Sequence, residues 1–201
     1  YMFSACYALQ NVNLSSFDTS NVLDMSYMFN MCEKLQSLNI TNFNTQKVKA
    51  MTQMFCHCLS LKTLDVTHFN TQNVENMRLM FYNCKQLQSL NVTNFDTRNV
   101  TNMESMFAYC NALTTLDLSS FNTSKVITME RMVQDCRNME SIRLNSFNTS
   151  NVTNMLAMFH NCESLKTLDL STFDTSKVTD MSWMFHGCQS LTTLDLDNFN
   201  T

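Results

Sequence analysis

The 201-residue sequence has no proline and a single glycine, Gly187, so the two residues that most often form turns are almost missing. Turns must instead rely on Asn, Asp, Ser and Thr, whose side chains can bond the local backbone. No run of about 18 apolar residues is present, and therefore no transmembrane segment is expected. The net charge of −4 offers no basic stripe, which argues against a nucleic-acid partner.

A period of 26 residues runs through the whole chain. Phenylalanine recurs at this spacing from Phe17 to Phe199, each time followed two residues later by Thr, and cysteine recurs from Cys6 to Cys188. Such a period indicates a solenoid, a propeller or another tandem array. We expect residues 1–201 to form a single leucine-rich-repeat array of about 7.7 units (201/26), and an excerpt of a longer chain because both ends fall inside a unit.

Each unit has two halves with different spacings of apolar residues. In the last full unit, the residues from Val178 to Phe185 are apolar at i, i+3, i+6 and i+7, which predicts a helix of about two turns over 181–186. Asp180 is its expected cap, and Gly187 its expected left-handed end. The alternation from Leu191 to Leu196 predicts a short strand that stacks in parallel on its copies.

These elements predict an α/β solenoid, in which a right-handed leucine-rich-repeat coil carries a parallel β-sheet on one face and short helices on the other. A lone unit has too little apolar surface to fold, so neighbouring units must cover it. The repeated Met, Phe and Cys are therefore expected to line the interior, including Met106 and Phe107. Stacked Asn/Asp-Thr pairs, such as Asp96-Thr97, are expected to bond to each other and to the backbone.

The string Met-Phe-x-x-Cys-x-x-Leu-x-x-Leu-x-Leu, which ends the unit from Phe173 to Leu196, resembles the BspA-like branch of leucine-rich repeats. The fuller form, with Phe-Asp-Thr-Ser-x-Val-x-x-Met ahead of it, resembles repeats of bacterial surface proteins. The resemblance covers essentially the whole chain. It implies an extracellular or cell-surface array tied to adhesion or host contact, and it implies no catalytic residues.

The cysteines allow several interpretations. The eight cysteines in one register favour small buried thiols, although a disulfide ladder or a metal site would also use them. A ladder spreads its sulfurs along a line, which suits zinc poorly. Cys56-His57-Cys58 supplies three soft ligands without a fourth nearby, so a chance cysteine is favoured there. We expect no metal and no cofactor.

The outward position of the predicted strand holds mainly amide and carboxylate side chains. Such a face of a repeat array can grip a peptide or a glycan, although a solvated polar face would look the same. One carboxylate per coil gives too few oxygens for calcium. The candidate binding residues are Asn39, Asp65, Asn91, Asp117, Arg143, Asp169 and Asp195.

The sequence thus favours a non-enzymatic cell-surface protein for adhesion, which binds a host or matrix protein or a glycan through the polar strand face. An enzyme is disfavoured because no register supplies a convergent acid, base and nucleophile. The alternative is a structural spacer or fibre that self-associates end to end, since uncapped repeat ends are apolar.

Overall fold

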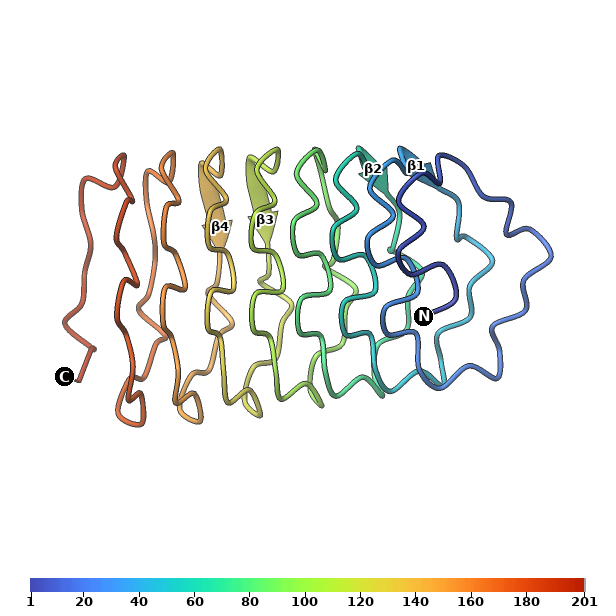
Figure 1. Ribbon diagram of the computed structural model, residues 1–201. Helices are drawn as coiled ribbons and strands as arrows, with labels where there is room; N and C mark the ends of the chain where they lie inside the picture. Colours follow the sequence, from blue (N-terminus) through green and yellow to red (C-terminus); the bar gives the residue numbers. More distant parts are fainter. Residues whose placement is uncertain (201) are drawn as a thin grey trace.

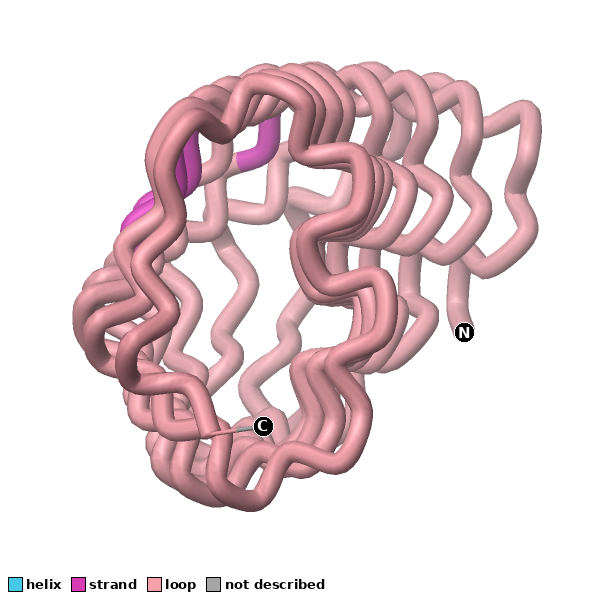
Figure 2. The backbone as a smooth tube through the Cα atoms, turned by 90° about the vertical axis from the view of Figure 1, so that its left-hand side faces the viewer, coloured by secondary structure: helices cyan, strands magenta, loops and turns pink. Residues whose placement is uncertain are grey.

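The computed structural model describes residues 1–200; Thr201, the last member of the predicted threonine register, lies outside the described residues. Successive turns of the chain form coils that stack along one axis in sequence order, with the first and last coils at opposite ends (Figure 1). Seen nearly along this axis, successive coils follow the same outline, and the coils toward the N-terminus are displaced to one side (Figure 2). This arrangement is the predicted solenoid.

Four short strands lie at one edge of the stack (Figure 1): β1 (Ser37–Leu38), β2 (Thr63–Leu64), β3 (Thr115–Asp117) and β4 (Ser141–Arg143). β1 pairs with β2 and β3 pairs with β4, both in parallel and with partner residues one period apart. The predicted parallel stacking in register is therefore confirmed. The strands are shorter than predicted, and residues 191–196 form none.

The predicted short helices are wrong, since residues 1–200 contain no helix and 181–186 form consecutive turns. We call residues 25–32 and their equivalents in each coil the turn ladder. Tyr27 N donates to Thr52 O (2.9 Å) and Phe29 N donates to Met54 O (2.9 Å), whereas Met28 N donates to Met25 O in its own coil. A helix needs these donors for its own carbonyls, so the bonds to the next coil prevent it.

Two residues in each turn ladder have a left-handed backbone. The predicted left-handed position before the cysteine is confirmed, with φ from 55° to 62° at its non-glycine members and 79° at Gly187. A second position, four residues earlier, was missed by the sequence analysis; its φ values run from 53° to 62° at Tyr27, Gln53, Leu79, Ser105, Arg131, Ala157 and Trp183.

The predicted helix caps have another role. Asn76 Oδ1 accepts from Arg78 N (2.9 Å) and Asp180 Oδ1 accepts from Ser182 N (2.9 Å), so these side chains fix a turn. The same positions pair in parallel bridges from coil to coil, from Asp24 to Asp180. They therefore start the turn ladder instead of a helix.

The apolar registers line the interior as predicted. Met106 and Phe107 are fully buried, and one hydrophobic cluster continues from Leu14 to Met184. The Phe81 ring stacks between those of Phe55 and Phe107, with centroid distances of 5.6 and 5.7 Å. This column of rings and the methionines beside it form the core.

All nine cysteines are free thiols, and seven of them are buried. Each thiol from Cys32 onward in the repeated register donates to a carbonyl of the preceding coil; Cys84 Sγ, for example, lies 3.2 Å from Phe55 O. Burial raises the pKa of Cys32 to about 11 and that of Cys56 to about 12. The register thus consists mainly of buried structural thiols, and those from Cys32 onward join successive coils.

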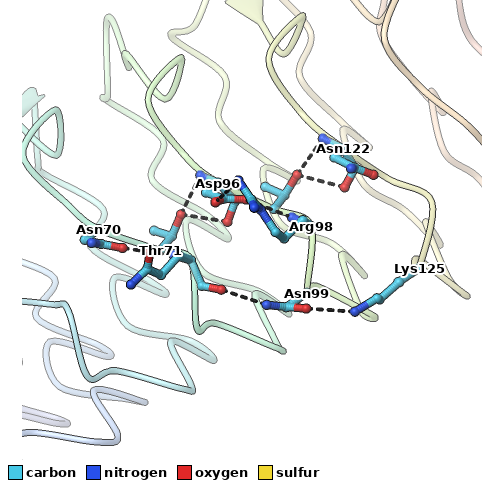
Figure 3. Close-up of polar contacts among 9 residues, drawn as sticks. Asn70, Thr71, Asp96, Arg98, Asn99, Asn122 and Lys125 are labelled. Carbon is cyan, nitrogen blue, oxygen red and sulfur yellow. Dashed lines mark hydrogen bonds and ion pairs between the residues drawn. The ribbon is translucent and has the colours of Figure 1, made fainter.

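The threonine register makes a second polar ladder. Thr71 Oγ1 donates to Asp96 O (3.0 Å) and accepts from Asp96 N (2.7 Å), and Thr97 repeats both bonds with Asn122 (Figure 3). Beside it, Lys125 Nζ donates to Asn99 Oδ1 (2.8 Å). The predicted structural role of the Asn/Asp-Thr pairs is confirmed.

Candidate binding surfaces of the coil

The candidate residues from the sequence occupy equivalent places in successive coils, in or directly after the strand position. All of them are exposed except Asp117, which is half-buried. We call this set the strand face: Asn39, Asp65, Asn91, Asp117, Arg143, Asp169 and Asp195.

Hydrogen bonds fix the acidic and amide side chains of the strand face. Asp65 Oδ1 accepts from Thr67 N (2.9 Å) and from Thr67 Oγ1 (2.6 Å), and Asp117 binds Ser119 in the same way. The Thr67 and Ser119 hydroxyls are the main cause of the lowered pKa of these carboxyls. Each carboxylate thus stays charged and is held at one oxygen by the turn that follows it.

Arg143, the one cation of the strand face, lies beside Asp117. Its Nη1 is 3.3 Å from Asp117 Oδ2, and its side chain is 75% exposed. An ion pair this exposed contributes little to stability, so the guanidinium remains accessible to a partner. Open depressions lie along the strand face, including one of about 430 Å³ beside Asn39 and Asp65 and one of about 280 Å³ between Arg143 and Asp169.

A second cleft, of about 430 Å³, opens on the turn ladders of the five coils from Met31 to Gln134. It shares no lining residue with the two strand-face depressions described above. We call it the turn-ladder cleft, and its principal polar and aromatic residues are Gln53, His57, Tyr82, Glu104, Tyr109, Arg131 and Gln134.

The ring groups of the turn-ladder cleft are uncharged at neutral pH. Burial lowers the pKa of His57 and raises the pKa of Tyr82 and of Tyr109. His57 Nδ1 lies 2.8 Å from Asn83 Nδ2, and Gln134 Nε2 donates to the Tyr109 hydroxyl (3.1 Å). The cleft can therefore offer neutral hydrogen-bonding groups beside aromatic rings.

The turn-ladder cleft could not be predicted from the 26-residue period because its residues vary from coil to coil. A search for residues that recur every 26 positions passes over such columns. The variation itself was visible in the sequence, however. The column of Gln53 also contains Leu79, Ser105 and Arg131, while the strand column is nearly constant.

Neither a histidine-activated nucleophile nor a metal-ligand cluster is present in the described residues. Within residues 1–200, no histidine is hydrogen-bonded to a serine, threonine or cysteine side chain, the pair that nucleophilic catalysis commonly uses. The same residues contain no group of three or more His, Cys, Asp or Glu placed to hold a metal ion, and no helix long and apolar enough to cross a bilayer.

Comparisons with known proteins agree with the solenoid. The sequence matches the family DUF285, described as "Mycoplasma protein of unknown function", over residues 1–115, 59–143 and 129–201. No curated protein matches it.

Two solved structures share the fold. A leucine-rich repeat protein from Bacteroides ovatus superposes with a TM-score of 0.57 at 17% identity, over 90% of this chain and 41% of its own. The T. pallidum leucine-rich repeat protein superposes with a TM-score of 0.56 at 19% identity, over 88% of this chain and 75% of its own. The chain thus spans less than half of the Bacteroides protein, and both likenesses confirm the leucine-rich-repeat fold.

Proposed function

The chain belongs to the DUF285 family, and from its leucine-rich-repeat fold we propose that it is a non-enzymatic interaction protein that binds a partner through the strand face. The observation that carries this proposal is the column of anchored carboxylates and amides on that face. The partner is a host or matrix protein or a glycan.

The hydrogen bonds that hold these side chains favour binding, because they lower the conformational entropy that the side chains lose when a partner binds. Asp65 and Asp169 each use Oδ1 for the turn that follows, and their second oxygen has no hydrogen-bond partner among residues 1–200. Free acceptors then recur at a constant spacing on a rigid support. A partner with amide or hydroxyl donors along its length can engage several coils at once, which multiplies weak contacts.

The proposal includes a cell-surface location, an adhesive role and a single array over residues 1–201. The resemblance to BspA-like surface repeats and the continuous hydrophobic core support these parts. Labelling intact and permeabilised cells of the source organism with an antibody to the chain tests the location. Equal labelling of both samples supports it, whereas labelling that requires permeabilisation contradicts it.

Variants that keep the turn but remove the charge test the strand face. Asp65→Asn and Asp169→Asn retain the Oδ1 acceptor, and Arg143→Ala removes the cation. Binding of the triple variant to cultured cells and to an immobilised extracellular-matrix extract is expected to fall about tenfold, because three contacts of a repeated surface are lost.

The matched control is Asp180→Asn, which changes another turn-forming carboxylate away from the strand face. This variant is expected to bind like the wild type. Unchanged binding of the triple variant, or an equal loss in the control, removes the strand face from the proposal.

A further inference from the structure

The main chain along the turn-ladder cleft has no free edge for an extended peptide. Gln53 N donates to Arg78 O, Leu79 N to Glu104 O, and Ser105 N to Glu130 O, all at 2.8 to 2.9 Å. Each coil gives these donors to the next coil, so strand addition is not available. A ligand in the cleft must be recognised by side chains.

The charges around the cleft are paired with one another. Arg78 Nε lies 2.8 Å from Glu104 Oε2, and Arg131 forms an ion pair with Glu130. Two cations and two anions cancel, so the cleft has no surplus charge to hold a phosphate, a carboxylate or an ammonium group. The pairing favours a neutral ligand with several hydroxyl groups, which can bond to Glu104 and to the guanidinium groups.

Aromatic rings stand beside these polar groups. The rings of Tyr82 and Tyr109 are 5.4 Å apart in an edge-to-face arrangement, and His57 meets Tyr82 in the same way at 5.2 Å. All three side chains are half-buried, so part of each ring remains accessible. Gln134 Oε1 is buried and has no partner within residues 1–200, which leaves an acceptor at the cleft unused.

The backbone that carries the cleft has one left-handed residue in the same place in successive coils. Gln53, Leu79, Ser105 and Arg131 line the cleft with φ between 53° and 57°. In this region Gly or Asn is favoured, and other residues cost about 1–2 kcal/mol each. None of the four is Gly or Asn, and the adjacent left-handed column likewise holds Met31, His57, Tyr109 and Asp135 beside Asn83, Asn161 and Gly187. Tyr27, Ala157 and Trp183 of the same column lie outside the cleft and have the same conformation, so it belongs to the coil and leaves the choice of side chain at the cleft free.

We propose that the turn-ladder cleft is a binding site for a neutral glycan, with one sugar ring packed against Tyr82 and Tyr109. A sugar ring combines an apolar C–H face, which packs on an aromatic ring, with hydroxyl groups that bond to amides and carboxylates. The volume of about 430 Å³ lies in the range of small-ligand sites. The site is separate from the strand face and does not depend on the function proposed for it.

Titration with neutral and charged oligosaccharides tests this site. The probes are maltotriose, cellotriose, triacetylchitotriose and lactose, with 3′-sialyllactose as the anionic probe, each followed by isothermal calorimetry with the 201-residue chain. At least one neutral probe is expected to bind saturably with a Kd of about 1 mM, an ordinary value for a shallow site of few contacts. Failure of every neutral probe, or binding of 3′-sialyllactose alone, overturns the proposal.

Two variants locate the binding. Tyr82→Leu removes the ring and Glu104→Gln removes the acceptor charge; each is expected to weaken binding about tenfold, as truncation of an anchor does. Arg98→Ala is the matched control, because Arg98 also sits in a surface ion pair but outside the cleft. Circular dichroism verifies that each variant is folded, and Glu104→Gln alone decides the test if Tyr82→Leu does not fold. Wild-type affinity in the folded cleft variants overturns the proposal, whatever the strand-face variants do.

Discussion

Replacing Thr97 by valine removes one hydroxyl from the threonine ladder and leaves its shape unchanged. Thr97 is 1% exposed; its Oγ1 donates to Asn122 O (2.9 Å) and accepts from Asn122 N (2.8 Å). Valine fills the same volume and makes neither bond. Both backbone groups of Asn122 then lose a partner at the junction between two coils.

The magnitude follows from these two bonds. A buried backbone group without its partner costs about 1–3 kcal/mol, and two such groups are left here. Water can reach part of this junction, because the Asn122 side chain is exposed. We therefore expect Thr97→Val to lower the free energy of unfolding by about 2 kcal/mol. Urea denaturation followed by circular dichroism measures it, with the midpoint as the primary quantity because repeat arrays can unfold in parts.

Thr97→Ser is the matched variant that separates hydrogen bonding from packing. Serine keeps the hydroxyl and loses one methyl group, which costs about 1 kcal/mol. The expected order of stability is therefore wild type, then serine, then valine. Packing alone predicts the reverse order for the two variants. A valine variant as stable as the wild type would refute the structural role given to the threonine ladder.

Three further outcomes are expected. At pH 8 the native chain should react slowly with a thiol reagent, since burial raises the pKa of Cys56 to about 12. Unfolding should make all nine thiols reactive, and fast labelling of most thiols in the native chain contradicts this. Phe81→Ala should cost about 3–5 kcal/mol in urea denaturation because its buried ring stacks on both sides, and a cost below about 1 kcal/mol argues against the stack. The carboxyls of Asp65 and Asp117 have a pKa below the ordinary 3.8 in the folded state. Their contribution to the stability of the fold is therefore present above about pH 4 and is lost as the pH falls below 3.8. A melting temperature that stays constant from about pH 5 to about pH 2.5 contradicts this.

The period and the interior could be predicted because they depend on residues that recur in nearly every coil, with few replacements such as Val133 for Phe. Identical coils place Phe81 above Phe55, and any other register would expose both rings. The left-handed position before the cysteine was also predictable, since Gly187 and Asn83 are among the residues that tolerate it. In each case a chemical property of the side chain selected one arrangement.

The helix could not be excluded from the sequence because its apolar spacing also fits the turn ladder. The decisive difference is the partner of alternate N–H groups, such as Tyr27 N, which lies in the next coil at Thr52 O. Local spacing carries no information on a bond to a residue 25 positions away. For the same reason, the recurring cysteine was recognised as buried, while its donor role toward the preceding coil was not.

The tandem copies of each position separate what the fold requires from what it leaves free. Thr97 and its equivalents are constant because the hydroxyl joins two coils, and replacing Thr97 would remove its two hydrogen bonds to Asn122. The column of Gln53 has nearly the same φ in every coil, yet its side chains range from Ala157 to Trp183. Since one backbone conformation accommodates all of them, the fold does not select their identity. Selection for contacts with other molecules can therefore act on this column coil by coil, and a binding surface can change along the array without loss of the solenoid.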